Sequence, residues 1–259
     1  MTNIRSLIFN ALFFIYGTLS SIVLLLTLPF PRRLLQKGLK LWMKITMATL
    51  KTVAGLDFEI RGLANLPPGA AIIVSKHLSA WETGIFLLIV NDATYVLKKE
   101  LLAIPFYGLL LRKSKMIAID RDGGASSLKK LVGESVSALD EGRKVVIFPE
   151  GTRAAVGDKL PYHPGVAAVY KKADAPVIPV ALNSGLFWAR RSFQKRPGCI
   201  VLEYLDPMPT GLDRKTFMAE LEDRIETATH RLIAEGKAKW GTDGGQLPVK
   251  NVDNCHKQP

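Results

Sequence analysis

The chain has no charged residue between Arg5 and Arg32, and this gap constrains its fold more than any other feature. The stretch from 7 to 30, LIFNALFFIYGTLSSIVLLLTLPF, would be roughly 36 Å long as a helix, at about 1.5 Å per residue. A hydrocarbon core is about 30 Å thick, so this helix is long enough to cross it with some tilt. A cleaved signal peptide is the alternative, but the stretch is long and no small-residue cleavage site follows it. We therefore expect a retained membrane segment.

Basic residues gather directly after this segment. By the positive-inside rule they place the rest of the chain on the cytoplasmic side, so we expect the cytoplasmic (inner) membrane, with the main domain on its cytoplasmic face. A bend between Gly17 and Ser21 would instead give a re-entrant hairpin that never crosses, and this alternative stays open. The basic residues are Arg32, Arg33, Lys37, Lys40 and Lys44.

The stretch from 34 to 53 has an amphipathic helical pattern. At about 100° per residue, Leu35, Leu39 and Trp42 share one face and the lysines lie on the opposite face. We expect an interfacial helix that lies on anionic headgroups, because it directly follows the membrane segment. An ordinary domain helix with a solvated basic face is the alternative.

Strand and helix patterns alternate after residue 54. This alternation predicts an α/β fold with a mixed, largely parallel sheet flanked by helices. We divide the chain into a membrane anchor with its interfacial helix (1–54), a main domain (55–240) and a polar tail expected to be disordered (241–259). Strands are expected around 58–61, 71–74, 94–97, 116–119, 145–148, 177–182 and 200–204, and helices around 81–90, 126–140, 166–172 and 214–234.

The formal net charge of +12 favours anionic partners. Nucleic acid, an anionic membrane and a phosphorylated substrate all meet that condition. Nucleic acid is disfavoured, because the charge clusters beside the membrane segment and no recognition motif accompanies it.

The two cysteines occupy different settings, Cys199 in an apolar run and Cys255 in the polar tail. Their placement does not suggest a disulfide framework, and nothing resembles a set of zinc ligands. We expect free thiols in a reducing, cytoplasmic setting, and no metal.

A histidine and a glutamate follow the strand at 71–74, where chemistry gathers in open α/β sheets. On one helix five residues rotate by roughly 140°, so His77 and Glu82 meet only if the histidine precedes the helix and the glutamate lies in its first turn. The carboxylate would then fix the tautomer of the imidazole and stabilise its protonated form. A capping box is the alternative, with Ser79 as N-cap and Glu82 reaching back to it. His77 alone is equally compatible with a structural histidine.

Two arginines at strand ends are candidates for anion binding, because a guanidinium fork matches phosphate oxygens. Arg153 ends the phrase FPEGTR at 148–153, in which Gly151 permits a close approach of the backbone. Arg121 follows the strand at 115–120. A surface charge with an acidic partner is the alternative for each arginine. Lys98 and Lys99 are weaker candidates for the same role.

Four phrases in this order resemble the glycerolipid acyltransferase family, whose bacterial members make phosphatidic acid. They are His77-x4-Glu82, the block ending in Asp120-Arg121, FPEGTR at 148–153 and APVIPV at 175–180. The resemblance covers roughly residues 74 to 183, and the stretch from Lys98 to Pro105 also looks like the family. Glu82 is a departure, because the family's usual acid is aspartate. No nucleophile elbow, Walker loop or dinucleotide fingerprint occurs, so the nucleophile of an acyl transfer must come from the substrate.

The resemblance implies transfer of an acyl group from acyl-CoA or acyl carrier protein to the hydroxyl of lysophosphatidic acid, yielding phosphatidic acid for phospholipid biosynthesis. It implies that His77, helped by Glu82, is the general base, a role typically worth about 10²–10⁴-fold. Arg121 and Arg153 would hold the phosphate, and no metal or redox cofactor is required. The glycerol site would be shaped by Glu150, Gly151 and Thr152.

Two other functions stay open. Transfer to another lysolipid, such as lysophosphatidylcholine or a lyso-ornithine lipid, would make less use of paired arginines. A non-catalytic membrane-binding protein would need only the apolar segment and the basic helix, and the intact His77 and FPEGTR phrases speak against it.

Overall fold

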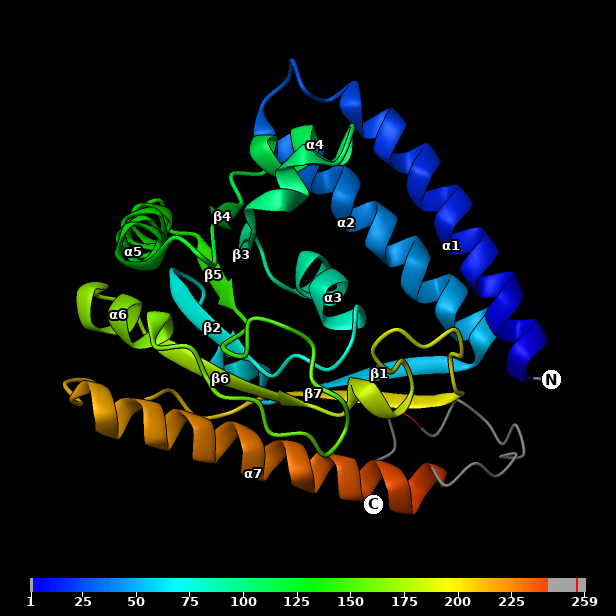
Figure 1. Cartoon of the computed structure of the whole chain (residues 1–259). Helices are drawn as coiled ribbons and strands as arrows, with labels where there is room; N and C mark the ends of the chain where they lie inside the picture. Colours follow the sequence, from blue (N-terminus) through cyan, green and yellow to red (C-terminus); the bar gives the residue numbers. More distant parts are fainter. Residues whose placement is uncertain (1, 242–254, 256–259) are drawn as a thin grey trace.

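The fold is seen in a computed structural model that describes residues 2–241 and Cys255. Seven strands form one sheet in the order β1-β7-β6-β2-β5-β3-β4 (Figure 1). Neighbouring strands are parallel except for β6 and β7, so the expected mixed, largely parallel sheet is confirmed. The strands are β1 (Leu56–Arg61), β2 (Ala71–Ser75), β3 (Ala93–Lys98), β4 (Ile117–Ile119), β5 (Lys144–Ile147), β6 (Val177–Leu182) and β7 (Gly198–Tyr204).

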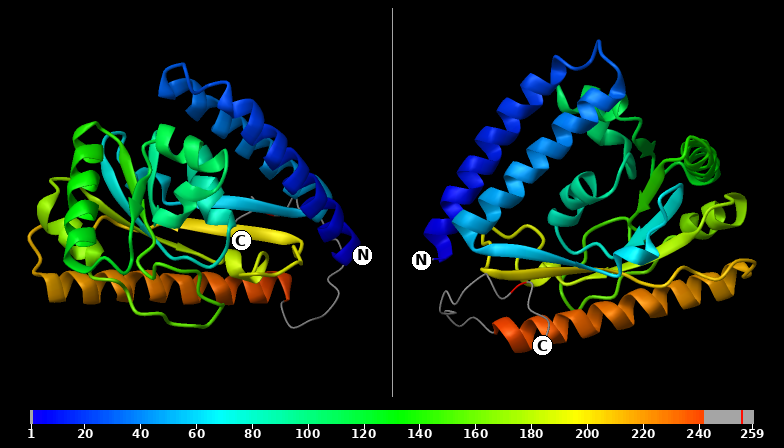
Figure 2. Two further views of the ribbon diagram at one scale, coloured as in Figure 1. Left: turned by 45° about the horizontal axis from the view of Figure 1, so that its top comes forward. Right: turned by 180° about the vertical axis from the view of Figure 1, so that it is seen from behind.

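Helices cover both faces of the sheet, because side chains alternate between the two faces of each strand. On β2, Ile72 and Val74 pack with α5, α6 and α7, whereas Ile73 packs with α1, α2 and α3. Figure 2 shows α7 under the sheet and the first two helices on its other side. The helices are α1 (Thr2–Leu25), α2 (Arg32–Thr49), α3 (Trp81–Ile89), α4 (Tyr107–Lys113), α5 (Gly124–Asp140), α6 (Gly165–Lys172) and α7 (Arg214–Trp240). Short turns are η1 (Leu50–Ala54), η2 (Leu63–Asn65), η3 (Lys99–Ala103) and η4 (Ser184–Leu186).

Within the described part of the chain, α1 is the one helix long and apolar enough to cross a membrane. Both of its ends nevertheless contact the main domain. Near its start, Ser6 Oγ accepts a hydrogen bond from the backbone N–H of Lys195 (2.9 Å), and the ring of Phe9 packs edge-on against Trp188. Near its end, Leu24 is buried with Leu110 of α4. The apolar segment therefore contacts the main domain near both of its ends, and few of its side chains are buried.

The helix expected at 34–53 is α2 followed by the π-helical turn η1. Its apolar face packs against the protein, as the alternative of an ordinary domain helix predicts, and Leu35 and Met43 are buried against its neighbours. The outward face carries the exposed Lys37, Lys40 and Lys44 together with exposed apolar side chains, among them Leu41. Cations and apolar groups on one exposed face are typical of a helix at a lipid interface.

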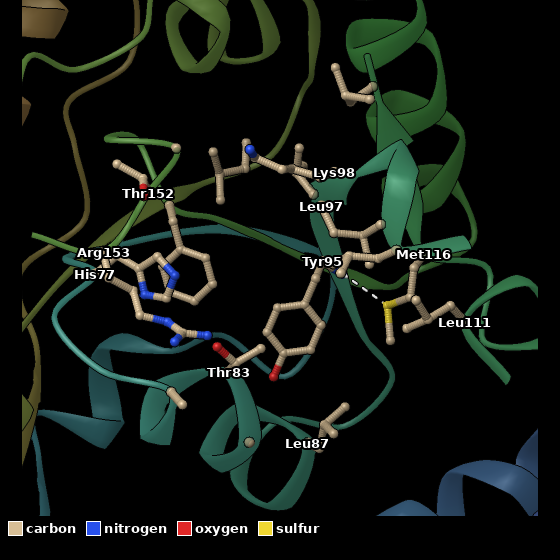
Figure 3. A pocket seen from close by; sticks show the side chains of 18 of the residues that line it. His77, Thr83, Leu87, Tyr95, Leu97, Lys98, Leu111, Met116, Thr152 and Arg153 are labelled. Carbon is tan, nitrogen blue, oxygen red and sulfur yellow. Dashed lines mark hydrogen bonds between the residues drawn. The ribbon is translucent and has the colours of Figure 1, made fainter. Parts of the chain in front are cut away.

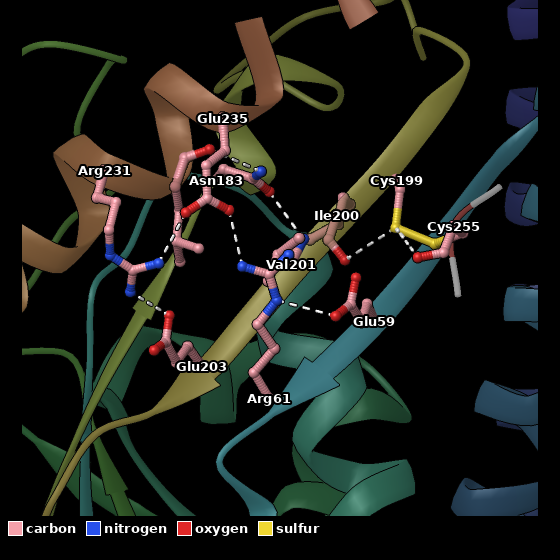
Figure 4. Close-up of polar contacts among 11 residues, drawn as sticks. Glu59, Arg61, Asn183, Cys199, Ile200, Val201, Glu203, Arg231, Glu235 and Cys255 are labelled. Atoms are coloured by element: carbon pink, nitrogen blue, oxygen red, sulfur yellow. Dashed lines mark hydrogen bonds and ion pairs between the residues drawn. A yellow bond between two sulfur atoms is a disulfide. The ribbon is translucent and has the colours of Figure 1, made fainter. Parts of the chain in front are cut away.

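The expectation of two free thiols is wrong, because a disulfide joins Cys199 of β7 to Cys255 (Figure 4). The two residues are 56 positions apart, and their Cα atoms are separated by 5.5 Å. Sequence spacing could not reveal this proximity, since it depends on the path of the chain after α7. The remainder of the predicted disordered tail, 242–254 and 256–259, lies outside the described residues.

Ion pairs tie α7 to the edge of the sheet beside that disulfide (Figure 4). Arg61 of β1 binds Glu59 and Glu235, and Arg231 of α7 binds Glu203 of β7. These contacts hold α7 against β1 and β7, the two strands that are antiparallel to the rest of the sheet.

Candidate active site

A cavity of about 1010 Å³ lies between the first four helices and the carboxyl ends of the central strands. In Figure 3, His77, Thr152, Arg153 and Lys98 lie toward one side of this cavity, and Leu87, Leu111 and Met116 toward the other. Polar groups thus face an apolar wall, an arrangement that suits an amphiphilic ligand. The wall also includes Phe13, Leu24, Trp42, Met43, Leu101, Tyr107 and Leu110.

His77 and Glu82 meet as the sequence predicted. His77 lies in the turn after β2, Glu82 lies in the first turn of α3, and Nδ1 of the histidine is 3.0 Å from Oε1 of the glutamate. The imidazole stacks on Phe148 with the ring centroids 4.0 Å apart, and 12% of the His77 side chain is exposed, in the cavity wall. A carboxylate at Nδ1 favours the tautomer with hydrogen on that atom, which leaves Nε2 as a proton acceptor.

The capping alternative for Glu82 holds as well, so the two hypotheses were not exclusive. Oε1 of Glu82 also accepts hydrogen bonds from the backbone N–H groups of Leu78 and Ser79. Ser79 Oγ in turn accepts from the N–H of Trp81 (3.1 Å), a second side-chain bond to a free N–H at the helix start. One carboxylate therefore starts the helix and orients the histidine.

Ser184, which the sequence analysis missed, completes the surroundings of Glu82. Its hydroxyl donates to Oε2 of Glu82 (2.9 Å), and both side chains are fully buried. Ser184 follows β6, which runs parallel to β2, so the residues after both strands emerge at one edge of the sheet. A serine at the end of a buried strand was the available signal.

Glu150 does not line the cavity, whereas the resemblance implied a place for it at the glycerol site. Its side chain is fully buried behind the cavity, where Oε1 accepts from the backbone N–H of His77 (3.3 Å) and is 3.3 Å from Nζ of Lys76. Burial raises the pKa of Glu150 to about 7, although the nearby ammonium group of Lys76 opposes that change. The turn after β5 directs this side chain toward Lys76, and the sequence pattern does not specify that direction. Glu150 supports the backbone of the histidine.

A buried polar network extends from Glu150 to the far face of the sheet. Nζ of Lys76 donates to Oε1 of Glu226 on α7 (2.6 Å), and the hydroxyl of Tyr162 donates to the same oxygen (3.0 Å). Burying charged groups is costly unless they are paired, so each member depends on the others. The network fixes the residue directly before His77.

The predicted anion-binding residues Arg121, Arg153 and Lys98 all line the cavity with Gly151 and Thr152. Among the described residues, no carboxylate lies within ion-pair distance of Arg121 or Arg153, although Glu100 is close enough to Arg121 to act on its pKa. Partial burial lowers the pKa of Arg121 from its usual value. Lys99 instead pairs with Asp120.

His163 is a second residue that the sequence analysis missed. Gly151 has a φ of +64°, and a Cβ there would lie 3.1 Å from Nε2 of His163 and 3.7 Å from Cζ of Arg121. Glycine at 151 thus lets the side chains of His163 and Arg121 approach its backbone. The backbone N–H of His163 donates to the carbonyl of Pro149 (2.8 Å), which fixes its position beside FPEGTR. No motif includes His163, so the sequence carried no signal for it.

Within residues 2–241 and Cys255, no group of three or more His, Cys, Asp or Glu side chains is arranged to hold a metal ion. The site consists instead of one histidine–carboxylate pair and a set of cationic side chains around an amphiphilic cavity.

Comparison with known proteins identifies a family and several similar chains. A family model described as Acyltransferase matches residues 57–183. A 1-acyl-sn-glycerol-3-phosphate acyltransferase of Pseudomonas aeruginosa is 36% identical over 229 residues, which are 88% of this chain and 88% of that protein. One of Helicobacter pylori is 32% identical over 68% of this chain and 74% of its own. The crystal structure of a 1-acyl-sn-glycerophosphate acyltransferase from Thermotoga maritima has the same fold, with a TM-score of 0.72 at 21% identity over 90% of this chain and all of the other.

Proposed function

This chain belongs to the glycerolipid acyltransferase family, and on that premise we propose that it acylates the free sn-2 hydroxyl of lysophosphatidic acid to make phosphatidic acid. The acyl donor is a thioester, acyl-CoA or acyl carrier protein. The observation that carries the proposal is the contact of 3.0 Å between His77 and Glu82 in the wall of a cavity that Arg121 and Arg153 also line.

In the reaction, Nε2 of His77 takes the proton of the acceptor hydroxyl while the hydroxyl oxygen attacks the carbonyl carbon of the thioester. The carbon–sulfur bond of the resulting tetrahedral intermediate then breaks, and the departing thiolate takes the proton from the imidazolium. Glu82 stabilises the imidazolium between these steps. No acyl-enzyme is formed, because the acceptor supplies the nucleophile, and general-base catalysis of this kind is worth about 10²–10⁴-fold.

The acceptor's phosphate is held by Arg121 and Arg153, with His163 beside them and Lys98 at the cavity wall. Gly151 and Thr152 contact the glycerol portion. Guanidinium groups bind a phosphate monoester in two-pronged fashion, which favours lysophosphatidic acid over zwitterionic or phosphate-free lysolipids. The apolar wall of the cavity receives acyl chains.

The protein is attached to the cytoplasmic leaflet of the cytoplasmic membrane through α1 and the outward face of α2. Contacts of both ends of α1 with the domain favour a helix that lies in one leaflet over one that crosses the bilayer. The basic side chains on α2 suit anionic headgroups. The disulfide between Cys199 and Cys255 argues against the cytoplasmic side, because such bonds are rare in the cytoplasm. Titration of thiols in protein isolated without reductant tests whether this bond forms.

The direct test supplies purified protein with lysophosphatidic acid and either acyl-CoA or acyl carrier protein, and identifies the product by mass spectrometry. Wild type should make phosphatidic acid, and His77→Ala almost none. Parallel reactions contain lysophosphatidylcholine or a lyso-ornithine lipid as acceptor. Preference for one of these would replace the proposed acceptor, and no product from any acceptor would favour a non-catalytic membrane-binding protein.

A further inference from the structure

A run of exposed apolar side chains leads into α4. Residues 103–107, with the sequence AIPFY, are all exposed, and Leu109 follows on the same surface. The exposed fractions are 44% for Ile104, 56% for Phe106 and 46% for Leu109. The stretch from 101 to 111 contains no charged residue. Soluble surfaces rarely leave a contiguous patch of this kind uncovered, so something covers it in the working protein.

The backbone at this patch is strained. Phe106 has φ +62° and ψ −51°, and the N–H of Tyr107 donates to the carbonyl of Pro105 (2.6 Å), which closes a γ-turn of the rare form with a positive central φ. Gly108 makes this turn possible, because a Cβ there would lie 2.1 Å from the carbonyl oxygen of Leu102. Strained residues persist where the surroundings stabilise them and are found at functional sites. Here the strained residue presents an aromatic ring to the outside.

The patch is continuous with the apolar surface of the first two helices. Leu110 of α4 is buried with Leu24 of α1 and Leu35 of α2, so these elements form one unit. Figures 1 and 2 show α4 beside the turn between α1 and α2. That turn also exposes apolar side chains, including Leu26 and Phe30.

Exposed cations lie close in sequence to both apolar segments. Arg33 at the start of α2 and Arg112 at the end of α4 are exposed, whereas no acidic residue occurs between 101 and 113. An apolar patch bordered by cations matches an anionic bilayer, in which acyl chains lie below negative headgroups.

We propose that residues 103–109, together with the turn between α1 and α2, insert into an anionic lipid bilayer. The opposite side of this segment faces the cavity, which is lined by Leu101, Tyr107, Leu110 and Leu111. The segment therefore separates bilayer lipid from the active-site cavity and is the wall that a lipid acceptor passes. Insertion stands apart from the enzymatic activity, whereas the passage of the acceptor rests on the proposed function.

Insertion is tested with an environment-sensitive fluorophore, NBD, attached to the single added thiol of Ile104→Cys. On phosphatidylglycerol vesicles the emission should shift to the blue and increase, with a smaller change on phosphatidylcholine. The matched control is Lys215→Cys on α7, on the other side of the molecule, and its emission should not change (Figure 2). An unchanged emission at position 104 on phosphatidylglycerol would overturn the proposal. A blue shift without vesicles that grows with protein concentration would also overturn it, in favour of a second copy of the chain.

A second variant tests the consequence for substrate without a label. Phe106→Ser should bind phosphatidylglycerol vesicles about tenfold more weakly, since a buried phenyl ring contributes strongly to partition. Leu63→Ser, which alters an exposed apolar residue of η2, should bind like wild type. Unchanged vesicle binding by a folded Phe106→Ser would contradict insertion whatever the activity. If binding falls as expected, turnover of a short-chain, water-soluble acceptor should be unchanged while the apparent KM for a long-chain acceptor in vesicles rises.

Discussion

The hydroxyl of Ser184 donates a hydrogen bond of 2.9 Å to the buried carboxylate of Glu82, although the two residues are 102 positions apart. Glu82 uses its other oxygen for Nδ1 of His77 and for two backbone N–H groups. Four donors thus compensate the burial of one carboxylate, which would otherwise be costly. The carboxylate beside the proposed catalytic histidine is therefore held in part by a serine from a distant turn.

Removal of that serine should slow the reaction without weakening substrate binding. A hydrogen bond to a charged group is worth about 1.5–3 kcal/mol, so Ser184→Ala should lower kcat by about tenfold to a hundredfold while KM for the acceptor changes little. Ser184→Thr keeps the hydroxyl and should recover most of the rate. Ser135→Ala, at another fully buried serine, is the control and should leave kcat unchanged. Equal kcat for wild type and Ser184→Ala would remove Ser184 from its positioning role.

Replacement of Glu82 by glutamine separates its two functions. Glutamine can still accept hydrogen bonds from the N–H groups of Leu78 and Ser79, so the melting temperature should stay within a few degrees. The charge beside His77 is lost, and we expect kcat to fall by about a hundredfold or more. Activity measured on lysophosphatidic acid and thermal unfolding of the same preparation check both parts. Near-normal turnover would mean that Glu82 serves only to cap α3.

The arginines should discriminate acceptors by their phosphate. Arg121→Ala should lower kcat/KM for lysophosphatidic acid by about tenfold to a hundredfold, the range expected for losing a charge-assisted hydrogen bond. The same variant should use monoacylglycerol, which has no phosphate, as well as wild type does. Arg214→Ala on α7 is the control with an exposed arginine elsewhere. A parallel loss for both acceptors would argue against phosphate binding by Arg121.

His163 should contribute to acceptor binding but not to the chemical step. We expect His163→Ala to raise KM for lysophosphatidic acid several-fold with little change in kcat, because a neutral hydrogen bond is worth about 0.5–1.5 kcal/mol. His163→Gln keeps a hydrogen-bond donor, so its KM should lie between those of wild type and His163→Ala. His230→Ala, at an exposed histidine of α7, should behave as wild type. A decrease confined to kcat would contradict this assignment.

Glu150 should make stability depend on pH. Its pKa is raised from 4.5 to about 7 by burial, so the folded protein binds an additional proton between these values. The corresponding stabilisation is complete below pH 4.5 and is lost as the pH rises toward 7. Glu150→Gln stays neutral, so its unfolding temperature should fall less than that of wild type between pH 5 and pH 8. Glu134→Gln, at an exposed site on α5, should follow the wild-type curve, and coincident curves for Glu150→Gln would show that Glu150 is charged throughout.

Sequence alone determined the features that depend on neighbouring residues. The charge-free run predicted α1, periodicity of two and of 3.6 predicted the strands and helices, and their alternation predicted the sheet. The rule that ligands bind at the carboxyl ends of strands predicted a site at His77, Arg121 and Arg153, and all three line one cavity. The spacing of five residues was enough to predict the contact between His77 and Glu82, because the turn and the helix start are local structures.

Only the tertiary structure decided the contacts between distant parts of the chain. Three such contacts join segments that are far apart in the sequence: the hydrogen bonds of Ser184 to Glu82 and of Lys76 to Glu226, and the disulfide of Cys199 and Cys255. The side-chain direction of Glu150 and the contacts of α1 with the domain likewise depend on residues far away in the sequence. A hydrophobic pattern specifies which face of an element is buried but not which element covers it, and that choice is made when the layers assemble.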